Sequence, residues 1–490
     1  MHGSSRRDFL ALAAGAFAPL PGNTVPAGHL ATGVKVGEIT PSAARIWARR
    51  TRDAQRKVDG VAALRDTTKA RVLPLDVEVS TLEGACPGDA GQLRLLLSNA
   101  KGKRVHTSEW ITVSAATDFT HQFRFADLKP DSAYSYTIET RGSAHKTDGV
   151  LSGAFRTAPR EDAASSINFA MLSCQKYSQR DDDLGFHLYD AMRQWAPHFY
   201  LSVGDNVYYD SDDPKVNQVS VARHHWHRMF SLPRIVECSR AVPAYFLKDD
   251  HDCYSDDCWP GYVNEAMKPF SFDQGLKLFS EQVPLGDRSY RRVRWGQGVE
   301  LFLLEGRDFR SANTSPDSPK KSIWGPEQRR WLEQALSFSQ AHWKIIVSPT
   351  PLVGPDRKNK HDNHSNDAFA HEGREFRQWV AKNMRNDTVV VCGDRHWQYH
   401  SVDPETKVQE FGCGAASDSH ASGTPGEDPK MHRFHRVKGG FLAMQVKMEG
   451  PASKLVIAHR DVHGTEVYRR EFEKPGGVRA AGRYVGGFAG

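Results

Sequence analysis

Beyond residue 160 the hydrophobic positions fall into short apolar runs separated by longer amphipathic stretches. The apolar runs are of strand length and span residues 167–172, 198–203, 244–247, 299–304, 343–347 and 388–391. The amphipathic stretches between them have helical periodicity and span residues 185–194, 216–230, 264–282, 326–338 and 367–383. Strands that alternate with helices predict a layered α/β architecture. Alternating patterns over residues 441–448, 454–459 and 466–472 predict that the sheet ends in antiparallel strands.

Residues 33–159 have a different pattern, in which short strands are separated by clusters of Gly, Pro, Asp and Ser. The expected strands include residues 34–36, 44–47, 93–97 and 121–125. A Pro-Asp turn at residues 130–131 leads into a strand with Tyr134, Tyr136 and Ile138 on alternate positions, which resembles the tyrosine strand of fibronectin type III sandwiches. This part is therefore predicted to be a β-sandwich that packs against or positions the rest of the chain.

The first 27 residues have the features of an export signal. Arg6 and Arg7 precede a short apolar stretch, and Val25-Pro26-Ala27 forms a small-residue cleavage pattern. The chain is accordingly divided into a twin-arginine signal peptide at residues 1–27, a β-sandwich domain at 28–159 and a catalytic domain at 160–490. Export by the twin-arginine translocase predicts a periplasmic or secreted protein that folds, and receives any metal, in the cytoplasm.

Composition excludes several classes of protein. The chain is 39% hydrophobic and 25% charged, and no run after the N-terminus approaches the roughly 20 apolar residues that span a bilayer. The net charge of +6 is spread along the chain without a basic stripe, so no stable nucleic-acid or membrane partner is expected. Seven cysteines form no CxxC pair, which disfavours a zinc ribbon. Cys253 and Cys258 are read either as a small loop disulfide or as free thiols.

Polar motifs follow four of the predicted strands directly. They are Ser173-Cys174-Gln175, Gly204-Asp205-Asn206-Val207-Tyr208, Asp249-Asp250-His251-Asp252 and Gly393-Asp394-Arg395-His396. Each motif alone has an ordinary structural reading as a turn, a solvated loop or a core cysteine. Their recurrence at strand ends, where ligands bind in α/β sheets, predicts one shared site. Several buried carboxylates require cations, so two adjacent metal ions are expected. Thiolate and phenolate ligands suit a ferric or other transition-metal ion at one position. The carboxylate-rich side also suits calcium or another hard cation.

In their order along the chain, these four motifs resemble those of the PhoD-type alkaline phosphatase D family of the metallophosphoesterase superfamily. The resemblance implies a fibronectin III or Ig-like sandwich followed by a four-layer αββα domain. It also implies that Cys174 and Tyr208 bind the ferric ion and that Asp205 bridges the two metals. Asp250, Asp394 and His396 would complete the metal pair.

The resemblance also suggests roles for residues beside the metals. His251 would donate a proton to the leaving oxygen or contact phosphate, with a structural hydrogen bond to Asp249 or Asp252 as its alternative. Arg307 would contact phosphate or form a scaffold ion pair. Two positions depart from the family pattern: Asp252 replaces a usual Glu, and Glu305 lies in a block that more often reads Asp-Thr-Arg.

The resulting functional hypothesis is an exported phosphoesterase that hydrolyses phosphate monoesters, diesters or both by attack of metal-bound hydroxide at phosphorus. Fe³⁺ and Ca²⁺ are the expected metals, with Zn or Mn as alternatives at the second position. Small phosphate esters or a phosphodiester polymer would be the substrate, and phosphate scavenging the role. The competing hypotheses are a secreted binding protein with a structural metal site and a metal-dependent nuclease. Ser173 lacks the Gly-x-Ser-x-Gly context of a serine hydrolase.

A polar segment at residues 356–367 lacks periodicity and contains His361 and His364. Such a segment is typical of loops at the protein surface. It is therefore predicted to be a mobile surface loop.

Overall fold

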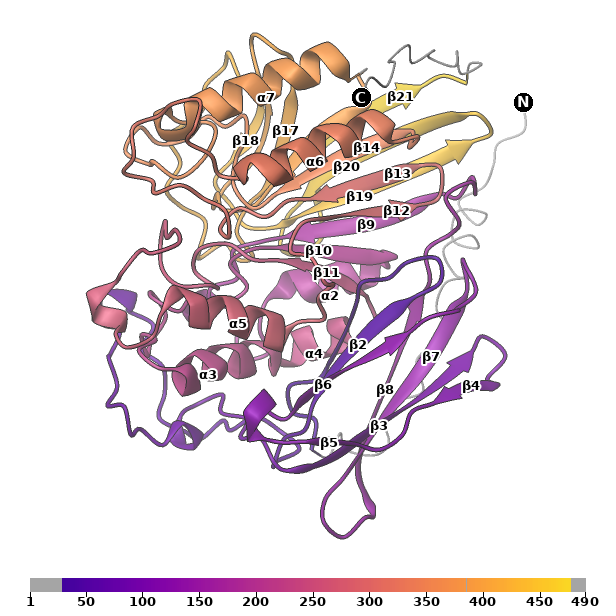
Figure 1. Cartoon of the computed structure of the whole chain (residues 1–490), viewed down its shortest axis with the longest axis vertical. Coiled ribbons are helices and arrows are strands. Elements are labelled where there is room, and N and C mark those ends of the chain that lie inside the picture. The colour runs from indigo at the N-terminus through magenta and orange to yellow at the C-terminus, as the bar shows by residue number, and fades with distance from the viewer. Residues whose placement is uncertain (1–28, 385, 477–490) are drawn as a thin grey trace, which may run out of the picture.

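The computed structural model describes residues 29–384 and 386–476. Two large sheets lie face to face, with helices on both outer sides (Figure 1). One outer side carries α6 (Gly325–Phe338) and α7 (Ala370–Asn383). The other carries α2 (His187–Trp195), α3 (Val219–Phe230), α4 (Pro233–Ser239) and α5 (Phe272–Gln282). The predicted signal peptide lies outside the described residues.

The first sheet has nine strands and a parallel centre. Across the sheet the order is β21 (Glu466–Lys474), β20 (Ala452–Arg460), β19 (Phe441–Glu449), β9 (Ile167–Leu172), β10 (Phe199–Val203), β11 (Ala244–Leu247), β1 (Val34–Gly37), β2 (Ala44–Arg49) and β6 (Thr120–Phe125). Strands β9, β10 and β11 are parallel neighbours, so their carboxyl ends lie at the same edge. Strands β19 to β21 are antiparallel, which confirms the prediction for the tail.

The second sheet has seven strands. Its order is β12 (Arg291–Trp295), β13 (Val299–Leu303), β14 (Trp343–Ser348), β15 (Thr388–Cys392), β17 (Gln409–Cys413), β16 (Gln398–Val402) and β18 (His432–Arg436). The parallel strands β13, β14 and β15 match the predicted apolar runs. Strand β18 was not predicted, because its sequence, His-Arg-Phe-His-Arg, contains a single hydrophobic residue and reads as a polar segment.

Alternate side chains of the central strands divide the core into three layers. On β10, Leu201 packs between the two sheets, whereas Tyr200 packs against the helices on the outer side. In the second sheet, Ile345 faces the first sheet and Ile346 packs beneath α6 and α7. The predicted four-layer αββα arrangement is therefore confirmed. No helix in the described ranges has both the length and the apolarity that a membrane span requires.

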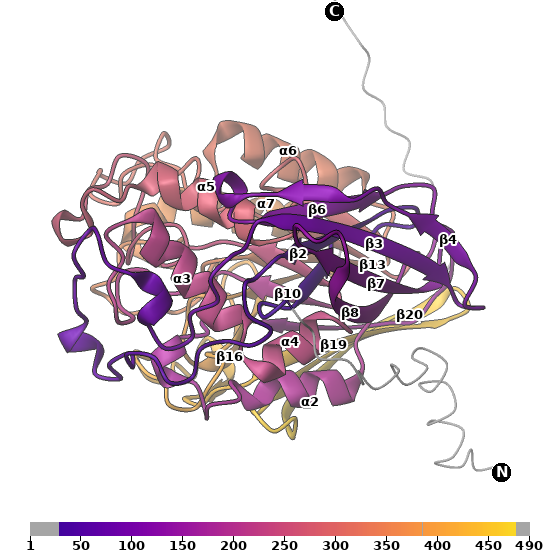
Figure 2. The ribbon, with the colours of Figure 1, turned by 90° about the horizontal axis from the view of Figure 1, so that it is seen from below.

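A third sheet lies within the N-terminal part and contains the tyrosine strand. Its strands are β4 (Arg104–Thr107), β3 (Gly91–Asn99), β7 (Ala133–Arg141) and β8 (Thr147–Arg156), with β5 (Ile111–Val113) paired to β3. Tyr134, Tyr136 and Ile138 are buried as predicted. Figure 2 shows this sheet beside the helical layer, seen from below.

The other N-terminal strands extend the large nine-stranded sheet. Strand β1 runs parallel to β11, with Gly37 opposite Ala244. A Cβ atom at Gly37 would lie 2.6 Å from the main-chain oxygen of Ala244, so a glycine is required at this contact. Backbone pairing therefore crosses the predicted domain boundary at residues 159 and 160, and the boundary itself remains a prediction.

Two local predictions differ from the structure. The helix expected over residues 264–282 begins only at Phe272, because Pro269 has no amide hydrogen to donate and Ser271 then caps the helix. The segment at residues 356–367 is not a simple surface loop, since Asp362 and His364 are buried. Asp362 pairs with Arg395 at 3.2 Å, so the segment's polar groups serve internal contacts that a hydropathy pattern does not show.

Candidate metal centre

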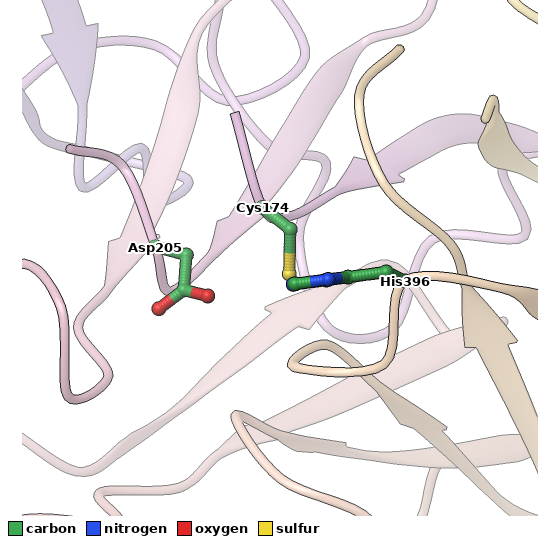
Figure 3. A group of neighbouring side chains, drawn as sticks. All are labelled: Cys174, Asp205 and His396. Atoms are coloured by element: carbon green, nitrogen blue, oxygen red, sulfur yellow. The ribbon is translucent and has the colours of Figure 1, made fainter. Parts of the chain in front are cut away.

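Three metal-binding side chains from separate strand ends meet at one edge of the sheets. Cys174 follows β9, Asp205 follows β10 and His396 follows β15. One ligand atom of each lies within 4.8 Å of the others. Figure 3 shows the thiol of Cys174 directed toward the imidazole of His396, with the carboxylate of Asp205 beside them. The convergence expected from the chain pattern is present.

The backbone at these strand ends adopts an unusual conformation. Cys174, Asp205 and Asp394 have φ values of 56°, 54° and 63°, in the left-handed region that non-glycine residues rarely occupy. Gly204 also has a positive φ, of 76°, and a Cβ atom there would lie 2.5 Å from the Cβ atom of Asp249. Such conformations cost free energy and cluster at functional sites, where the surrounding structure holds them in place.

Tyr208 joins the same group, as predicted. Its side chain is buried, and its hydroxyl donates a hydrogen bond to Asp205 Oδ2 at 2.9 Å. The hydroxyl oxygen also lies 3.5 Å from His396 Nε2. A thiol, a phenol, a carboxylate and an imidazole therefore surround one small volume.

His420 lies beside this group, and the strand-end pattern does not mark it. Its Nε2 atom lies 3.1 Å from His396 Nε2 and 3.4 Å from the hydroxyl of Tyr208. The residue lies in the loop after β17, whose Ala416 amide donates to the main-chain oxygen of Cys174 at 3.2 Å. Because six residues separate His420 from the end of β17, the strand-end signal that marked the other residues is absent.

A second group of possible ligands shares Asp205 with the first. Asp205, Asp250 and His251 offer ligand atoms within 4.8 Å of one another. The amide of Asp257 donates to Asp250 Oδ2 at 2.7 Å, which orients that carboxylate. A carboxylate that bridges two cations must lie within reach of both ligand groups, and Asp205 belongs to both.

The hydrogen-bond partner of His251 differs from both alternatives named above. Its Nδ1 atom lies 2.6 Å from Asp210 Oδ1, and neither Asp249 nor Asp252 bonds to the ring. Burial alone would lower the pKa of His251, but the negative charges of Asp210, Asp250 and Asp205 raise it well above its usual value. These charges therefore favour the protonated form of His251, and its hydrogen-bond partner Asp210 is a second residue that sequence reasoning missed.

Asp394 is not brought into either ligand group. Its carboxylate pairs with Arg395, which also pairs with Asp356 at 3.0 Å and with Asp362 at 3.2 Å. Among the described residues, the groups that could hold a metal contain His396 but not Asp394. The implied role of Asp394 as a ligand thus lacks support from this geometry, because its neighbour in sequence already neutralises it.

For Arg307, the geometry supports the scaffold ion pair. The side chain is fully buried, and Nε donates to Asp249 Oδ1 at 2.5 Å. Its Nη2 atom lies 3.6 Å from Asp250 Oδ1, and Nη1 donates to the main-chain oxygen of Cys258 at 3.1 Å. Arg307 therefore positions Asp249 and Asp250, with no exposed surface for a phosphate.

The two departures from the family pattern lie in the framework of the site. Asp252 accepts from the amide of Asn206 at 3.0 Å and from that of Asp249 at 2.7 Å, so it joins two strand-end loops. Burial raises the pKa of Asp252 to about 7. Glu305 accepts from Lys248 Nζ at 2.5 Å and from the amide of Arg307 at 2.6 Å. Neither carboxylate is a member of the ligand groups.

The ligand groups fit metal ions on chemical grounds. The buried oxygens Asp205 Oδ1 and Asp250 Oδ1 have no hydrogen-bond partner. Burial and the charge of Asp205 raise the pKa of the Cys174 thiol well above its usual value. Burial likewise raises the pKa of Asp205, with Asp250 and Asp249 adding to the effect. Cations would compensate these crowded anions and convert the thiol and phenol into ligands.

One solvent-accessible cation lies beside this centre. Lys176 Nζ is 5.3 Å from the ring centroid of Tyr208, and the lysine side chain is partly exposed. Within the described part of the chain, no ion pair of Lys176 with a carboxylate is found within 4.0 Å. Its positive charge is thus available to an anion that approaches the centre.

Known proteins share sequence with this chain. The PhoD-like phosphatase family model matches residues 169–445, more than half of the chain. Alkaline phosphatase D of Bacillus subtilis (strain 168) is 24% identical over 351 residues, a match that covers 62% of this chain and 58% of that relative, less than two thirds of its length.

Solved structures show the same fold. The structure of PhoD has 16% identity and a TM-score of 0.68, covering 94% of this chain and 92% of that one. Purple acid phosphatase PPD1 from yellow lupin (Lupinus luteus) seeds has 12% identity and a TM-score of 0.61, covering 90% and 73%. The family match, together with the strand-end motifs, shows that the chain belongs to the PhoD-like phosphatase family.

Proposed function

We propose that the chain is a metal-dependent phosphoesterase that hydrolyses phosphate monoesters, diesters or both. The observation that carries the proposal is the convergence of Cys174, Asp205 and His396 from strand ends of the two large sheets. Buried carboxylate oxygens without hydrogen-bond partners support a cation beside them. Family membership supports the reaction class.

The donor types support iron at one position and calcium at the other. Thiolate, phenolate and imidazole from Cys174, Tyr208 and His396 suit a ferric ion. The carboxylates of Asp205 and Asp250 suit a hard cation such as calcium, with zinc or manganese as alternatives. Asp205 would contact both ions, because it belongs to both ligand groups.

When bound, two such cations would polarise the phosphoryl group of the substrate and activate a water molecule for in-line attack. The chain's own residues would handle the proton and the anion. His251, held through Nδ1 by Asp210, keeps a proton on Nε2 and delivers it to the leaving oxygen. Lys176 offers its charge to a non-bridging oxygen of the phosphate.

We also propose that the chain is exported through the twin-arginine pathway and that it serves in phosphate scavenging. The paired arginines at Arg6 and Arg7 and the following apolar stretch support export. Fractionation of cells that express the full chain, compared with a variant in which both arginines are lysines, tests it. The parent protein should reach the periplasm or medium, and the variant should remain in the cytoplasm.

The activity is tested with a substrate panel on protein of measured metal content. The panel contains p-nitrophenyl phosphate, bis(p-nitrophenyl) phosphate and a plasmid, so that monoesterase, diesterase and nuclease activities are separated. Turnover of at least one chromogenic ester at neutral to alkaline pH is expected. Metal-replete protein that hydrolyses neither ester contradicts the proposal, and retained affinity for a glycan or polymer would then favour a binding protein.

A further inference from the structure

Two buried thiols lie close together in the loop that follows Asp250. The Sγ atoms of Cys253 and Cys258 are 3.7 Å apart, and neither side chain is exposed to solvent. Both residues are free cysteines in the structure. The spacing is longer than a disulfide bond but short enough for the two sulfurs to be in contact.

The same loop holds Asp250 at both its main chain and its carboxylate. The Sγ atoms of Cys253 and Cys258 lie 3.4 and 3.7 Å from the main-chain oxygen of Asp250. That oxygen also accepts from the amides of Cys253 at 3.2 Å and Tyr254 at 2.7 Å. At the other end of the loop, the amide of Asp257 donates to Asp250 Oδ2 at 2.7 Å.

We propose that Cys253 and Cys258 form a reversible disulfide whose closure weakens metal binding at Asp250. A disulfide bond is about 2.05 Å long, so the sulfurs must approach each other considerably. The main chain of Cys253 has little room to move, because α5 packs so closely that a Cβ atom at Gly275 would lie 1.5 Å from the Cys253 main-chain oxygen. Main-chain movement on closure therefore falls on Cys258 and on the adjacent Asp257, whose amide orients the Asp250 carboxylate.

Closure also acts on a second contact of the same carboxylate. Arg307 Nη1 donates to the main-chain oxygen of Cys258, while Nη2 lies 3.6 Å from Asp250 Oδ1. Displacement of Cys258 shifts this guanidinium as well. Loss of a group that orients a metal ligand typically lowers metal affinity about 10- to 100-fold, and we expect a change in this range.

The chemistry requires an oxidant, for which a small organic disulfide such as oxidised glutathione suffices. One cysteine thiolate attacks the oxidant, forming a mixed disulfide and releasing one thiol. The second cysteine then displaces the second thiol, so that two protein thiols become one disulfide and one oxidant becomes two thiols. The exposed loop residues Asp256 and Gly261 allow local opening, which admits the oxidant to the buried pair.

The test incubates metal-loaded protein in glutathione buffers that range from fully reduced to fully oxidised. Peptide mapping by mass spectrometry measures the Cys253–Cys258 linkage, and elemental analysis with a competing chelator measures metal affinity. The linked peptide should accumulate in oxidising buffer while metal affinity falls, and reducing buffer should restore both. Neither measurement depends on phosphoester hydrolysis, although the inference assumes the proposed metal centre.

Three variants provide the comparison. The double variant Cys253→Ser and Cys258→Ser should bind metal alike in both buffers, and single Cys258→Ser serves if the double variant does not fold. Cys238→Ser, a buried cysteine of α4, should respond to the buffer as the parent does. Full alkylation of both thiols after oxidation overturns the proposal. So does a linked pair with unchanged metal affinity, or redox sensitivity that persists in the double variant.

Discussion

The Nε2 atoms of His396 and His420 lie 3.1 Å apart, and both are within 3.5 Å of the hydroxyl of Tyr208. Burial lowers the pKa of both imidazoles well below the usual value, with the neighbouring His420 adding to the effect on His396. Neutral imidazole is the form that binds metal ions. We therefore expect His420 to support a metal ion that His396 would bind.

Replacement of His420 tests this relationship. His420→Ala should lower metal affinity at least about 10-fold, by analogy with the loss of groups that support metal ligands, while the fold remains intact. His435→Ala is the matched control, because His435 is a partly exposed histidine of β18 outside the ligand groups. Metal titration followed by elemental analysis measures the effect, and equal affinity in both variants would exclude His420 from the centre.

The colour of the protein tests the iron assignment. Thiolate and phenolate ligands donate charge to Fe³⁺, so the iron-loaded protein should have a visible absorption band. Tyr208→Phe should shift or abolish the band, and Cys174→Ser should change it. Tyr209→Phe removes the neighbouring buried phenol, which accepts from Trp226, and should leave the band unchanged. A band that survives in both Tyr208→Phe and Cys174→Ser would remove these residues from the iron site.

Asp205 should have the largest effect on metal content. Because it belongs to both ligand groups, Asp205→Ala is expected to lose both metals together with activity. Asp205→Asn retains the shape of the side chain but not its charge, and should give an intermediate loss. Metal analysis after gel filtration measures this. Two retained metals with near-normal turnover in Asp205→Ala would show that the bridging assignment is wrong.

Arg307 should act through its carboxylate partners. Arg307→Met leaves Asp249 and Asp250 without their buried cation, and the free energy of unfolding should fall by about 3–5 kcal/mol, the usual cost of breaking a buried pair. Urea denaturation measures this. The inhibition constant of inorganic phosphate, measured on the metal-loaded fraction of the protein, should be nearly unchanged. A large rise in that inhibition constant at full stability would instead indicate direct phosphate contact.

The proton on His251 predicts a pH dependence. Burial lowers the pKa of His251, but the charges of Asp210, Asp250 and Asp205 raise it well above its usual value, so activity that needs this proton should fall as pH rises through the raised pKa. Asp210→Asn removes one of these charges and should move the alkaline limb of the kcat/KM profile to lower pH. His251→Gln should lower kcat about 10²- to 10⁴-fold, the usual contribution of a proton donor. If the alkaline limb of the kcat/KM profile does not move in Asp210→Asn, a group other than His251 causes that limb.

The parts of the structure that depend on local pattern were predicted from the chain. Strands β9 and β11 have the predicted bounds, and Tyr134, Tyr136 and Ile138 are buried on alternate positions. Local predictions were wrong where a single residue overrides periodicity. Pro269 separates α5 from the residues before it, although the helical pattern continues through it.

The sequence by itself determined which residues stand at strand ends, and the parallel pairing of β9 with β10 is sufficient to bring Cys174 and Asp205 to one edge. His396 follows β15 of the other sheet, so its approach to these two residues also depends on how the two sheets face each other. Only the tertiary structure decided that His420 lies beside His396, that His251 pairs with Asp210 and that Arg307 is buried against Asp249. Each of these contacts joins segments that are distant in sequence, and its existence depends on how loops from different strands pack, which no local pattern of polar and apolar residues encodes.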